Sequence, residues 1–501
     1  MSQYRLPQEF IELAKVSIGV EALAVYLECF NSQDELSVKG RGGVTSIRSN
    51  PEKLQEGATP ESFLASDAKY SSVPWCSNGY YLDERPKFTL DPLFHSGAYY
   101  VQEASSMFAQ LVFDTLKSKD SGFAESPIKV LDLCAAPGGK STHIATLLDE
   151  ESLLVSNEVI KSRVVILADN MAKWGAENVV VTNNDPRDFS SIREYFSIVF
   201  VDAPCSGEGM FIKDPQAINE WSLANVELCA GRQKRIIQDI WGSLRPGGYL
   251  VYSTCTFNHF ENDDNLKFMI DEFGAEPVAL DLPDNCGIIR TANGGYQFVP
   301  GVVKGEGQFM AVVRKPSGEE CDGYSCSNLR VKGGKRAEKG GKGAKAGATS
   351  QLKGFSYLPD KLYEFTLMGE FVKAYPKGLV NDIKFIEQQL KVVSSGVAAA
   401  TVKGKDYIPH ADLALCRHYA QLLGQSGPCD NGSGDVVPFP VVELTLEQAL
   451  TFLSKDPLVF DNQPNGYLLL TYKGVGLGFV KNLGTRSNNL LPQARRIRMM
   501  H

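Results

Sequence analysis

Two cysteines and an aspartate follow runs of β-branched and aromatic residues. The run at 197–201 leads into Asp202, and Cys205 comes shortly after it. A second run, at 248–254, ends directly at Cys255. Short runs of this composition predict buried strands, and ligands bind at the carboxyl ends of strands in open α/β sheets. We therefore expect two thiols, which are nucleophiles in their thiolate form, and one carboxylate at the same edge of a sheet.

A glycine-rich loop forms a second candidate site. Residues 129–133 predict a strand and residues 141–148 predict a helix. This layout presents backbone N–H groups and a helix N-terminus to a ligand. The loop has neither the G-x-G-x-x-G nor the G-x-x-x-x-G-K-[ST] spacing, which leaves open a ligand with a ribose and a carboxylate in place of a pyrophosphate. The loop residues are Cys134, Ala135, Ala136, Pro137, Gly138, Gly139 and Lys140.

Two acidic residues follow the next predicted strands. Glu158 comes after a strand at 153–157, about 20 residues beyond the glycine loop, where a carboxylate can accept hydrogen bonds from ribose hydroxyls. Asp185 comes after a strand at 178–182 and could border an adenine pocket. Both residues are expected at the same sheet edge as the thiols.

The elements that position these residues alternate along the chain. Helices are predicted at 160–174, 216–244 and 261–273, and predicted strands separate them. Such alternation predicts an α/β fold with a doubly wound, mostly parallel sheet. Two later short strands, near 287–290 and 308–314, are expected to form an antiparallel edge.

Shifts in composition divide the chain into five segments. The first contains a predicted helix over 6–27 and a strand over 44–50, where Arg48 is expected to be solvated, with a phosphate contact as the alternative. Residues 316–353 are a basic linker, for which a solvated spacer and a nucleic-acid-binding arm are equally good interpretations. The last segment contains a predicted hairpin that turns at Lys473-Gly474. The segments are an N-terminal α/β domain at 1–95, the doubly wound domain at 96–315, a basic flexible linker at 316–353, an intermediate domain at 354–430 and a β-rich domain at 431–501.

Length and composition narrow the function classes. A chain of 501 residues is longer than one domain of about 150 residues, so more than one domain is expected. Its net charge of −8 argues against binding nucleic acid through overall charge, although not against a local basic groove. The chain has no apolar run of about 18 residues and no signal-peptide pattern, which predicts a cytoplasmic protein with reduced thiols and no membrane association. Cys321 and Cys326 have no histidine nearby, so no metal site is expected. We expect a monomer.

Four motifs in order carry a family resemblance. They are CAAPGGK (134–140), Glu158, DAPCSGEG (202–209) and YSTCTF (252–257), and VQEASSM (101–107) precedes them. This order resembles the two-cysteine, S-adenosylmethionine-dependent RNA 5-methylcytosine methyltransferases. The C-terminal half resembles the bacterial branch of small-subunit ribosomal RNA methyltransferases (the F-like branch), whose members end in a PUA-like RNA-binding module. The resemblance implies a Rossmann-like methyltransferase domain between a small N-terminal α/β domain and C-terminal α+β and PUA-like domains.

The resemblance also implies roles for the site residues. The 134–140 loop is implied to hold the amino-acid end and ribose of S-adenosylmethionine, Glu158 the ribose hydroxyls, and Asp185 the adenine. Asp202 is implied at the methyl-transfer end and is our candidate for contact with the cytosine N3. Cys255 matches the nucleophile, and Cys205 matches the second cysteine, which assists product release.

Rival functions remain open. Ribosomal RNA is the favoured substrate, transfer RNA is the second choice, and a catalytically silent RNA-binding ribosome-assembly factor is the alternative outside the enzymes. Methylation of an exocyclic amine needs no pair of thiols, and its characteristic N/D-P-P-Y/F loop is absent from the sequence. A DNA substrate is disfavoured, because DNA enzymes of this chemistry attack with the thiol of the Pro-Cys loop.

Overall fold

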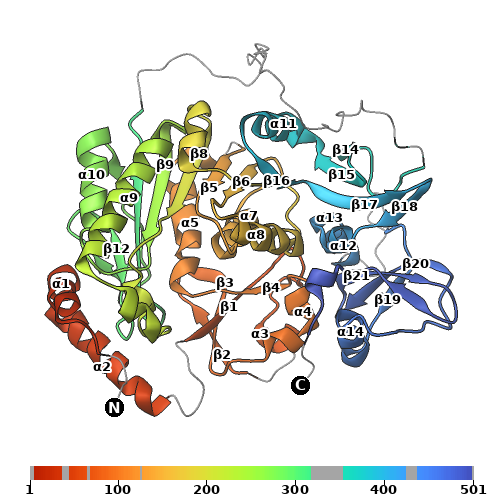
Figure 1. Cartoon of the computed structure of the whole chain (residues 1–501), viewed down its shortest axis with the longest axis horizontal. Coiled ribbons are helices and arrows are strands. Elements are labelled where there is room, and N and C mark those ends of the chain that lie inside the picture. Colours follow the sequence, from red (N-terminus) through yellow and green to blue (C-terminus); the bar gives the residue numbers. More distant parts are fainter. Residues whose placement is uncertain are drawn as a thin grey trace.

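The computed structural model describes residues 5–36, 44–64, 68–124, 127–317, 352, 354–424 and 437–498. Its largest sheet has ten strands, and nine of them follow the order β11-β12-β13-β9-β8-β5-β6-β7-β16, while β10 (Glu276–Pro277) pairs with β13. The strands β5, β6, β7, β8 and β9 pair in parallel. The predicted doubly wound sheet is therefore confirmed (Figure 1), but the sheet is mixed and not mostly parallel, because the five outer strands β10, β11, β12, β13 and β16 pair antiparallel. These strands are β5 (Lys129–Asp132), β6 (Leu153–Asn157), β7 (Val179–Thr182), β8 (Phe196–Asp202) and β9 (Leu244–Thr254).

Helices cover both faces of this sheet because its strands are apolar on both sides. Val130 contributes to the core under one set of helices, and the next residue, Leu131, contributes to the core on the other face. The first set is α5 (Ala109–Lys119), α7 (Gly139–Leu147) and α8 (Lys161–Trp174), and the second set is α9 (Leu223–Trp241), α10 (Asp263–Phe273) and α11 (Val380–Gln389).

The expected antiparallel edge is present. β13 (Gln308–Arg314) pairs antiparallel with β9, and β12 (Tyr296–Phe298) and β11 (Ile289–Arg290) extend the sheet beyond it. β13 thus covers the side of β9 that β8 leaves free, so the strand that leads to Cys255 has a neighbour on each side.

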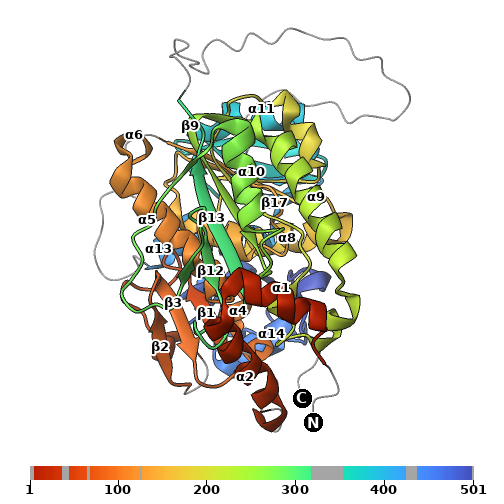
Figure 2. The ribbon, with the colours of Figure 1, turned by 90° about the vertical axis from the view of Figure 1, so that its left-hand side faces the viewer.

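The predicted helix over 6–27 is two helices. α1 (Gln8–Ile18) ends at Gly19, whose φ of 83° favours glycine, and α2 (Val20–Leu36) begins directly after it. Figure 2 shows both helices over the end of the sheet that carries β12. They bury Phe10 and Tyr26 against Phe257, two residues beyond Cys255.

The predicted helix over 216–244 also differs from the structure. A 3-10 turn occupies Pro215–Glu220, and α9 begins only after Ser222, whose hydroxyl accepts a hydrogen bond from the Asn225 N–H. A serine cap of this kind fixes a helix start, so the sequence before it is a separate element.

A four-stranded sheet precedes the ten-stranded sheet in the chain. Its order is β2-β3-β1-β4, and Arg48 lies on β1. Neither prediction for Arg48 holds, because its side chain is buried. It donates to the Gln102 Oε1 atom at 2.7 Å and to the Thr142 Oγ1 atom at 2.8 Å, and its guanidinium lies 4.4 Å from the Trp174 ring centre. Arg48 thus connects this sheet to α7 and α8. The strands are β1 (Thr45–Ser49), β2 (Tyr70–Val73), β3 (Cys76–Leu82) and β4 (Tyr99–Val101), with the short helices α3 (Pro60–Phe63) and α4 (Pro92–His95).

The C-terminal part contributes one strand to the central sheet and forms two sheets of its own. β16 (Val392–Ser395) pairs antiparallel with β7 and forms the last strand of the large sheet (Figure 1). The next sheet has the order β14-β15-β17-β18 and the last has the order β19-β20-β21-β22. Their elements are β14 (Tyr363–Met368), β15 (Phe371–Pro376), β17 (Val397–Lys403), β18 (Asp406–Pro409), α12 (Ala411–Leu415), α13 (Arg417–Gly424), β19 (Val441–Glu443), α14 (Leu446–Leu453), β20 (Gly466–Tyr472), β21 (Val475–Asn482) and β22 (Ser487–Asn489).

The predicted C-terminal hairpin is confirmed. β20 and β21 pair antiparallel, and both turn residues have positive φ, 49° at Lys473 and 75° at Gly474, as hairpin turns matched to strand twist require. The hairpin shares one apolar core with the N-terminal sheet, where Leu468 and Leu477 join Ile47 and Leu93. In the basic end of the chain, the Arg495 side chain is internal and binds Asp169 and Asp412, each at 2.7 Å, whereas Arg496 and Arg498 are exposed.

Nearly all of the predicted linker at 316–353, including Cys321 and Cys326, lies outside the described residues. Within the described ranges, no cluster of three or more His, Cys, Asp and Glu side chains could hold a metal ion. No helix in that same part of the chain is long and apolar enough to cross a membrane.

Candidate active site

The two thiols meet where β8 and β9 end. Parallel pairing aligns Asp202 with Ser253, so the loops that carry Cys205 and Cys255 leave the sheet side by side. Their sulfur atoms lie 3.0 Å apart, and the Cys255 N–H donates to the Cys205 sulfur at 3.3 Å. Both cysteines are free thiols. The structure therefore brings together the two sulfur atoms that were predicted from separate strand ends.

The Cys205 thiol keeps its proton. Its hydrogen bond to Cys255, its burial and the charge of Glu261 all raise the pKa of Cys205 well above its usual value. A protonated Cys205 can donate to the Cys255 sulfur, and such a donor stabilises negative charge on that sulfur. Cys205 is thus the protonated member of the pair.

Asp202 joins the thiol edge to the glycine loop. Its Oδ1 atom accepts from the Ser253 hydroxyl at 2.7 Å, and its Oδ2 atom accepts from the Lys140 Nζ atom at 2.9 Å. Burial lowers the pKa of Lys140, but the Asp202 charge and hydrogen bond outweigh it, so the pKa is raised and the lysine stays charged. Lys140 is thus an internal partner of Asp202.

The glycine loop turns sharply from β5 into α7. Gly138 precedes the first residue of α7 with a φ of 117°, a conformation that side chains rarely adopt. A Cβ at this position would also lie 3.3 Å from the Leu167 side chain. Ala135 and Ala136 are buried, whereas Pro137 is exposed. Burial and neighbouring carboxylates raise the pKa of Cys134, which makes this loop cysteine a poor nucleophile.

Glu158 lies beside the glycine loop and is only 3% exposed. Its Oε1 atom accepts from the Ile160 N–H at 2.8 Å, and its Oε2 atom lies 3.4 Å from Arg163. Arg163 also donates to the Ala136 carbonyl at 2.6 Å. Arg163 thus connects Glu158 to the glycine loop. The sequence-based prediction missed it, because the contact with Ala136 joins segments that are far apart in the sequence.

Asp185 is placed apart from these contacts. Its side chain caps the 3-10 helix Pro186–Ser191 by accepting from the Arg187 N–H at 3.2 Å. The loop before it is held by a segment far along the chain, because the Lys391 carbonyl accepts from the Asn183 N–H at 2.9 Å. Asn184 binds the Lys391 N–H in turn, at 3.1 Å. The predicted adenine side of the site is therefore shaped by the residue that precedes β16.

Asp132, at the end of β5, is a site residue that the sequence-based prediction missed. It is fully buried, its Oδ2 atom accepts from the Ser141 hydroxyl at 2.6 Å, and its Oδ1 atom has no partner among the described residues. Burial, with the charges of Asp202 and Glu158, raises its pKa to about 7, against the opposing Ser141 hydrogen bond. A carboxylate within an apolar strand was the signal available in the sequence.

Asp132→Asn is expected to stabilise the protein at pH 8. Above a pH of about 4 the unfolded chain has released the Asp132 proton, whereas the folded state keeps it up to a pKa of about 7. The free energy of unfolding therefore falls as the pH rises through this window, and asparagine, which resembles the protonated acid, avoids the loss. We expect a gain of about 1–4 kcal/mol at pH 8 that shrinks toward pH 5. Denaturant unfolding at both pH values measures it, and an equal difference at both would contradict the assignment.

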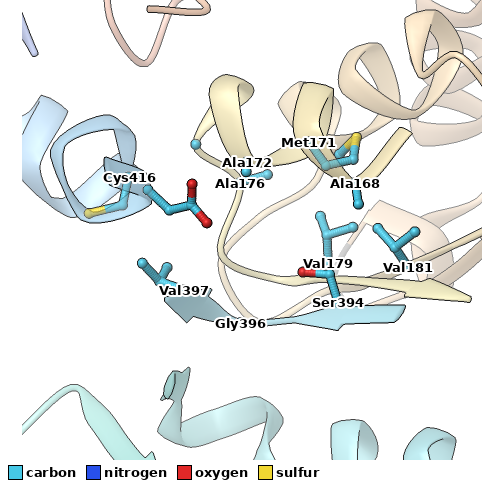
Figure 3. Close-up of a pocket in the computed structure, with 12 residues that line it drawn as sticks. Ala168, Met171, Ala172, Ala176, Val179, Val181, Ser394, Gly396, Val397 and Cys416 are labelled. Atoms are coloured by element: carbon cyan, nitrogen blue, oxygen red, sulfur yellow. The ribbon is translucent and has the colours of Figure 1, made fainter. Parts of the chain in front are cut away.

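Two cavities lie away from this edge. One, of about 30 Å³, has room for a single water and lies between α8 and the strands β7, β16 and β17. Figure 3 shows Ala168 and Met171 of α8 facing Val181 and Ser394 across it. The other, of about 790 Å³, lies between the segment that follows β1, the helix α13 and the turn of the C-terminal hairpin. It is lined by Lys53 and Lys473, whose amines donate to backbone carbonyls. Neither cavity is lined by a predicted site residue.

Three family models match the chain. Residues 123–314 match the model described as 16S rRNA methyltransferase RsmB/F. Residues 6–104 match the N-terminal domain of 16S rRNA methyltransferase RsmF, and residues 439–497 match the methyltransferase RsmF PUA domain.

Two relatives that match along about 90% of the chain have the same name. The ribosomal RNA small subunit methyltransferase F of Aliivibrio fischeri (strain MJ11) is 30% identical over 460 residues, which cover 90% of this chain and 89% of that protein. The protein of the same name from Shewanella denitrificans is 30% identical over 498 residues, with coverages of 90% and 91%. A solved methyltransferase homolog protein from Pyrococcus horikoshii has a TM-score of 0.51 at 24% identity, with 62% of this chain and 95% of that chain covered, and this likeness shows the fold alone.

Proposed function

The chain belongs to the ribosomal RNA small subunit methyltransferase F family, and from this premise we propose that it transfers a methyl group from S-adenosylmethionine to C5 of a cytosine in small-subunit ribosomal RNA. The observation that carries the proposal is the 3.0 Å separation of the Cys205 and Cys255 sulfur atoms at adjacent strand ends. An RNA-binding assembly factor without activity would have no need of two thiols in contact. Methylation of an exocyclic amine would have no need of them either.

The pair of thiols suits an attack on cytosine. C5 of cytosine is a weak nucleophile, and addition of the Cys255 thiolate to C6 makes it enamine-like, which divides one difficult step into easier ones. A hydrogen bond or proton at N3 relieves the charge that forms on the ring. Asp202 is our candidate for the contact with N3, and the Lys140 ammonium that donates to its Oδ2 atom is the source of the proton. After methyl transfer the C5 proton leaves and the C6–sulfur bond breaks. We assign assistance of this release to Cys205.

The glycine-loop edge fits the proposed cofactor. S-adenosylmethionine, when bound, supplies the methyl group on a sulfonium. The amino-acid end and ribose would bind at 134–140, the ribose hydroxyls at Glu158 and the adenine beside Asp185, with Asp202 at the methyl-transfer end. Arg163 connects Glu158 to the loop, so a single ligand can contact both, and the unpartnered Asp132 oxygen lies under the same loop.

Glu158→Gln is expected to weaken S-adenosylmethionine binding by about 1–3 kcal/mol, the range for a buried polar partner left unpaired. Glutamine keeps an oxygen for the Ile160 N–H, so the local fold should remain, while one acceptor for the ribose is lost. Isothermal titration with the cofactor measures the change. Asp149→Asn, at an exposed acid that only organises its own turn, is the matched control. Equal affinity of the Glu158 variant and the wild type would move the ribose site elsewhere.

Methylation of defined RNAs tests the proposal. The purified protein is incubated with labelled S-adenosylmethionine and one of three substrates: naked small-subunit ribosomal RNA, assembled small subunits, or transfer RNA. Bisulfite sequencing then locates any 5-methylcytosine. Methylation of ribosomal RNA supports the proposal, methylation of transfer RNA alone replaces its substrate, and cofactor binding without methylation of any RNA favours the silent assembly factor. Because free thiols are required, we place the activity in the cytoplasm.

A further inference from the structure

Two buried glutamates flank the thiols and were not predicted. Glu208 follows Cys205 on the same loop, and Glu261 follows Cys255 at the start of the segment that leads into α10. Glu208 is 1% exposed and Glu261 is 0% exposed. Neither forms an ion pair with any Lys, Arg or His that the structure describes. Burying a carboxylate without a cation is costly unless hydrogen bonds satisfy it, so the donors around each glutamate define its role.

Glu208 holds the segment after Cys255. Its Oε2 atom accepts from the Thr256 hydroxyl at 2.6 Å, the Phe257 N–H at 2.8 Å and the Asn258 N–H at 3.0 Å. These are the three residues that directly follow Cys255. Its Oε1 atom accepts from the Trp221 indole at 2.9 Å. Glu208 therefore belongs to the Cys205 loop by sequence but fixes the Cys255 loop.

Glu261 holds the Cys205 loop in the reciprocal manner. Its Oε2 atom accepts from the Ser206 N–H at 3.0 Å and from the Gln233 amide at 2.7 Å. The same Gln233 amide donates to the Pro204 carbonyl at 3.0 Å. The residues on both sides of Cys205 are thus tied to Glu261. Each glutamate follows one thiol in sequence and positions the other.

Asn258 connects the two halves of this arrangement. Its side-chain amide lies 3.0 Å from the Glu208 Oε1 atom and 2.8 Å from the Glu261 Oε1 atom. An amide has two N–H groups, so it can donate to both carboxylates at once. The two thiol loops are therefore connected by buried, charge-assisted hydrogen bonds, which are stronger than bonds between neutral groups.

We propose that Glu208 and Glu261 are positioning residues with separate tasks: Glu208 sets Cys255 for addition to C6, and Glu261 sets Cys205 for release of the product. This inference rests on the proposed function. A displacement of about 1 Å at a reacting atom can lower a rate about 100-fold, so loosening either loop should impair only the step that its cysteine performs. Glutamine at either position turns one acceptor oxygen into an N–H donor that faces other donors.

The experiment separates the two steps in the Cys205→Ala background, where release is already blocked and only addition is measured. E208Q in that background is expected to slow formation of the protein–RNA adduct by about 10- to 100-fold, whereas E261Q is expected to change it by less than about twofold. With Cys205 intact, E261Q should accumulate adduct during turnover, and E208Q should not. Denaturing electrophoresis of labelled RNA measures both. A role limited to stability would lower all of these signals together.

Further variants keep the test decisive. E272Q, at an exposed glutamate of α10, is the matched control and should behave as the wild type. Where E208Q does not fold, as shown by thermal unfolding, W221F removes one donor to Glu208 and should slow addition in the same background. Where E261Q does not fold, Q233A removes one donor to Glu261 and should accumulate adduct.

If Cys205→Ala traps RNA but E208Q and E261Q affect addition equally, the division of tasks is wrong. If Cys205→Ala and the wild type form neither adduct nor product, the proposed function itself fails.

Discussion

Cys255→Ala is expected to abolish methyl transfer while leaving the affinity for S-adenosylmethionine within about twofold of the wild type. Removal of a covalent nucleophile typically lowers the rate by about 10³-fold or more. Binding should survive, because the residues assigned to the cofactor are held by other contacts: Glu158 by the Ile160 N–H, and Lys140 by Asp202. Single-turnover assays with labelled cofactor measure the first effect, and isothermal titration measures the second.

A buried cysteine elsewhere in the chain, Cys229, provides the control for this variant. Cys229 lies in α9, and its thiol donates to the Asn225 Oδ1 atom at 4.0 Å, one turn earlier on the same helix. Cys229→Ala should keep activity within about threefold of the wild type, since a small core cysteine contributes mainly packing. Activity of Cys255→Ala within tenfold of the wild type would end its assignment as the nucleophile.

Cys205→Ala is expected to trap a covalent protein–RNA adduct. Without Cys205 the Cys255 thiolate can still add to C6 and the methyl group can still transfer, but elimination is slowed. The adduct should survive denaturing electrophoresis, and it should require both S-adenosylmethionine and the target cytosine. The contact between the two sulfur atoms supports this prediction, because both can then reach one base.

The outcome of paired variants assigns the two roles. The double variant without either thiol should form no adduct, since no group remains to attack C6. An adduct in Cys255→Ala that is absent from Cys205→Ala would mean that the roles are reversed. If neither variant traps RNA while the wild type methylates it, a mechanism without thiol addition must replace the one proposed.

The parts of the site that could be predicted from the sequence are those determined by the order of neighbouring residues. Strands that end at Asp202 and Cys255, and a glycine loop between a strand and a helix, follow from residue order alone, and the structure has them. Arg48 shows why other residues escaped prediction. Its burial depends on Gln102 and Thr142, which lie far along the chain, and polarity alone suggested the opposite.

The same physical reason explains the missed glutamates and the misplaced helix boundaries. Glu208 and Glu261 acquire their roles only when two loops of different strands meet, which a single-residue pattern does not encode. The break at Gly19 is a local event, but the apolar spacing continues across it, so periodicity reported one helix where backbone geometry makes two. Helix boundaries predicted from apolar periodicity should therefore be checked against glycines such as Gly19, which can end a helix, and serines such as Ser222, which can begin one.

The pairing of β16 with β7 determines when the domain is complete during synthesis. The ribosome produces β7 by residue 182, but its outer neighbour arrives only at residue 392, and Lys391, which holds Asn183 and Asn184, arrives with it. Until then the growing polypeptide presents an unpaired strand edge, which is a template for association with other chains. The nascent methyltransferase domain should therefore be most prone to aggregation, and most dependent on chaperones, in that interval. Arrest of translation before residue 392 should leave β7 open to proteolysis or hydrogen exchange that the finished protein resists.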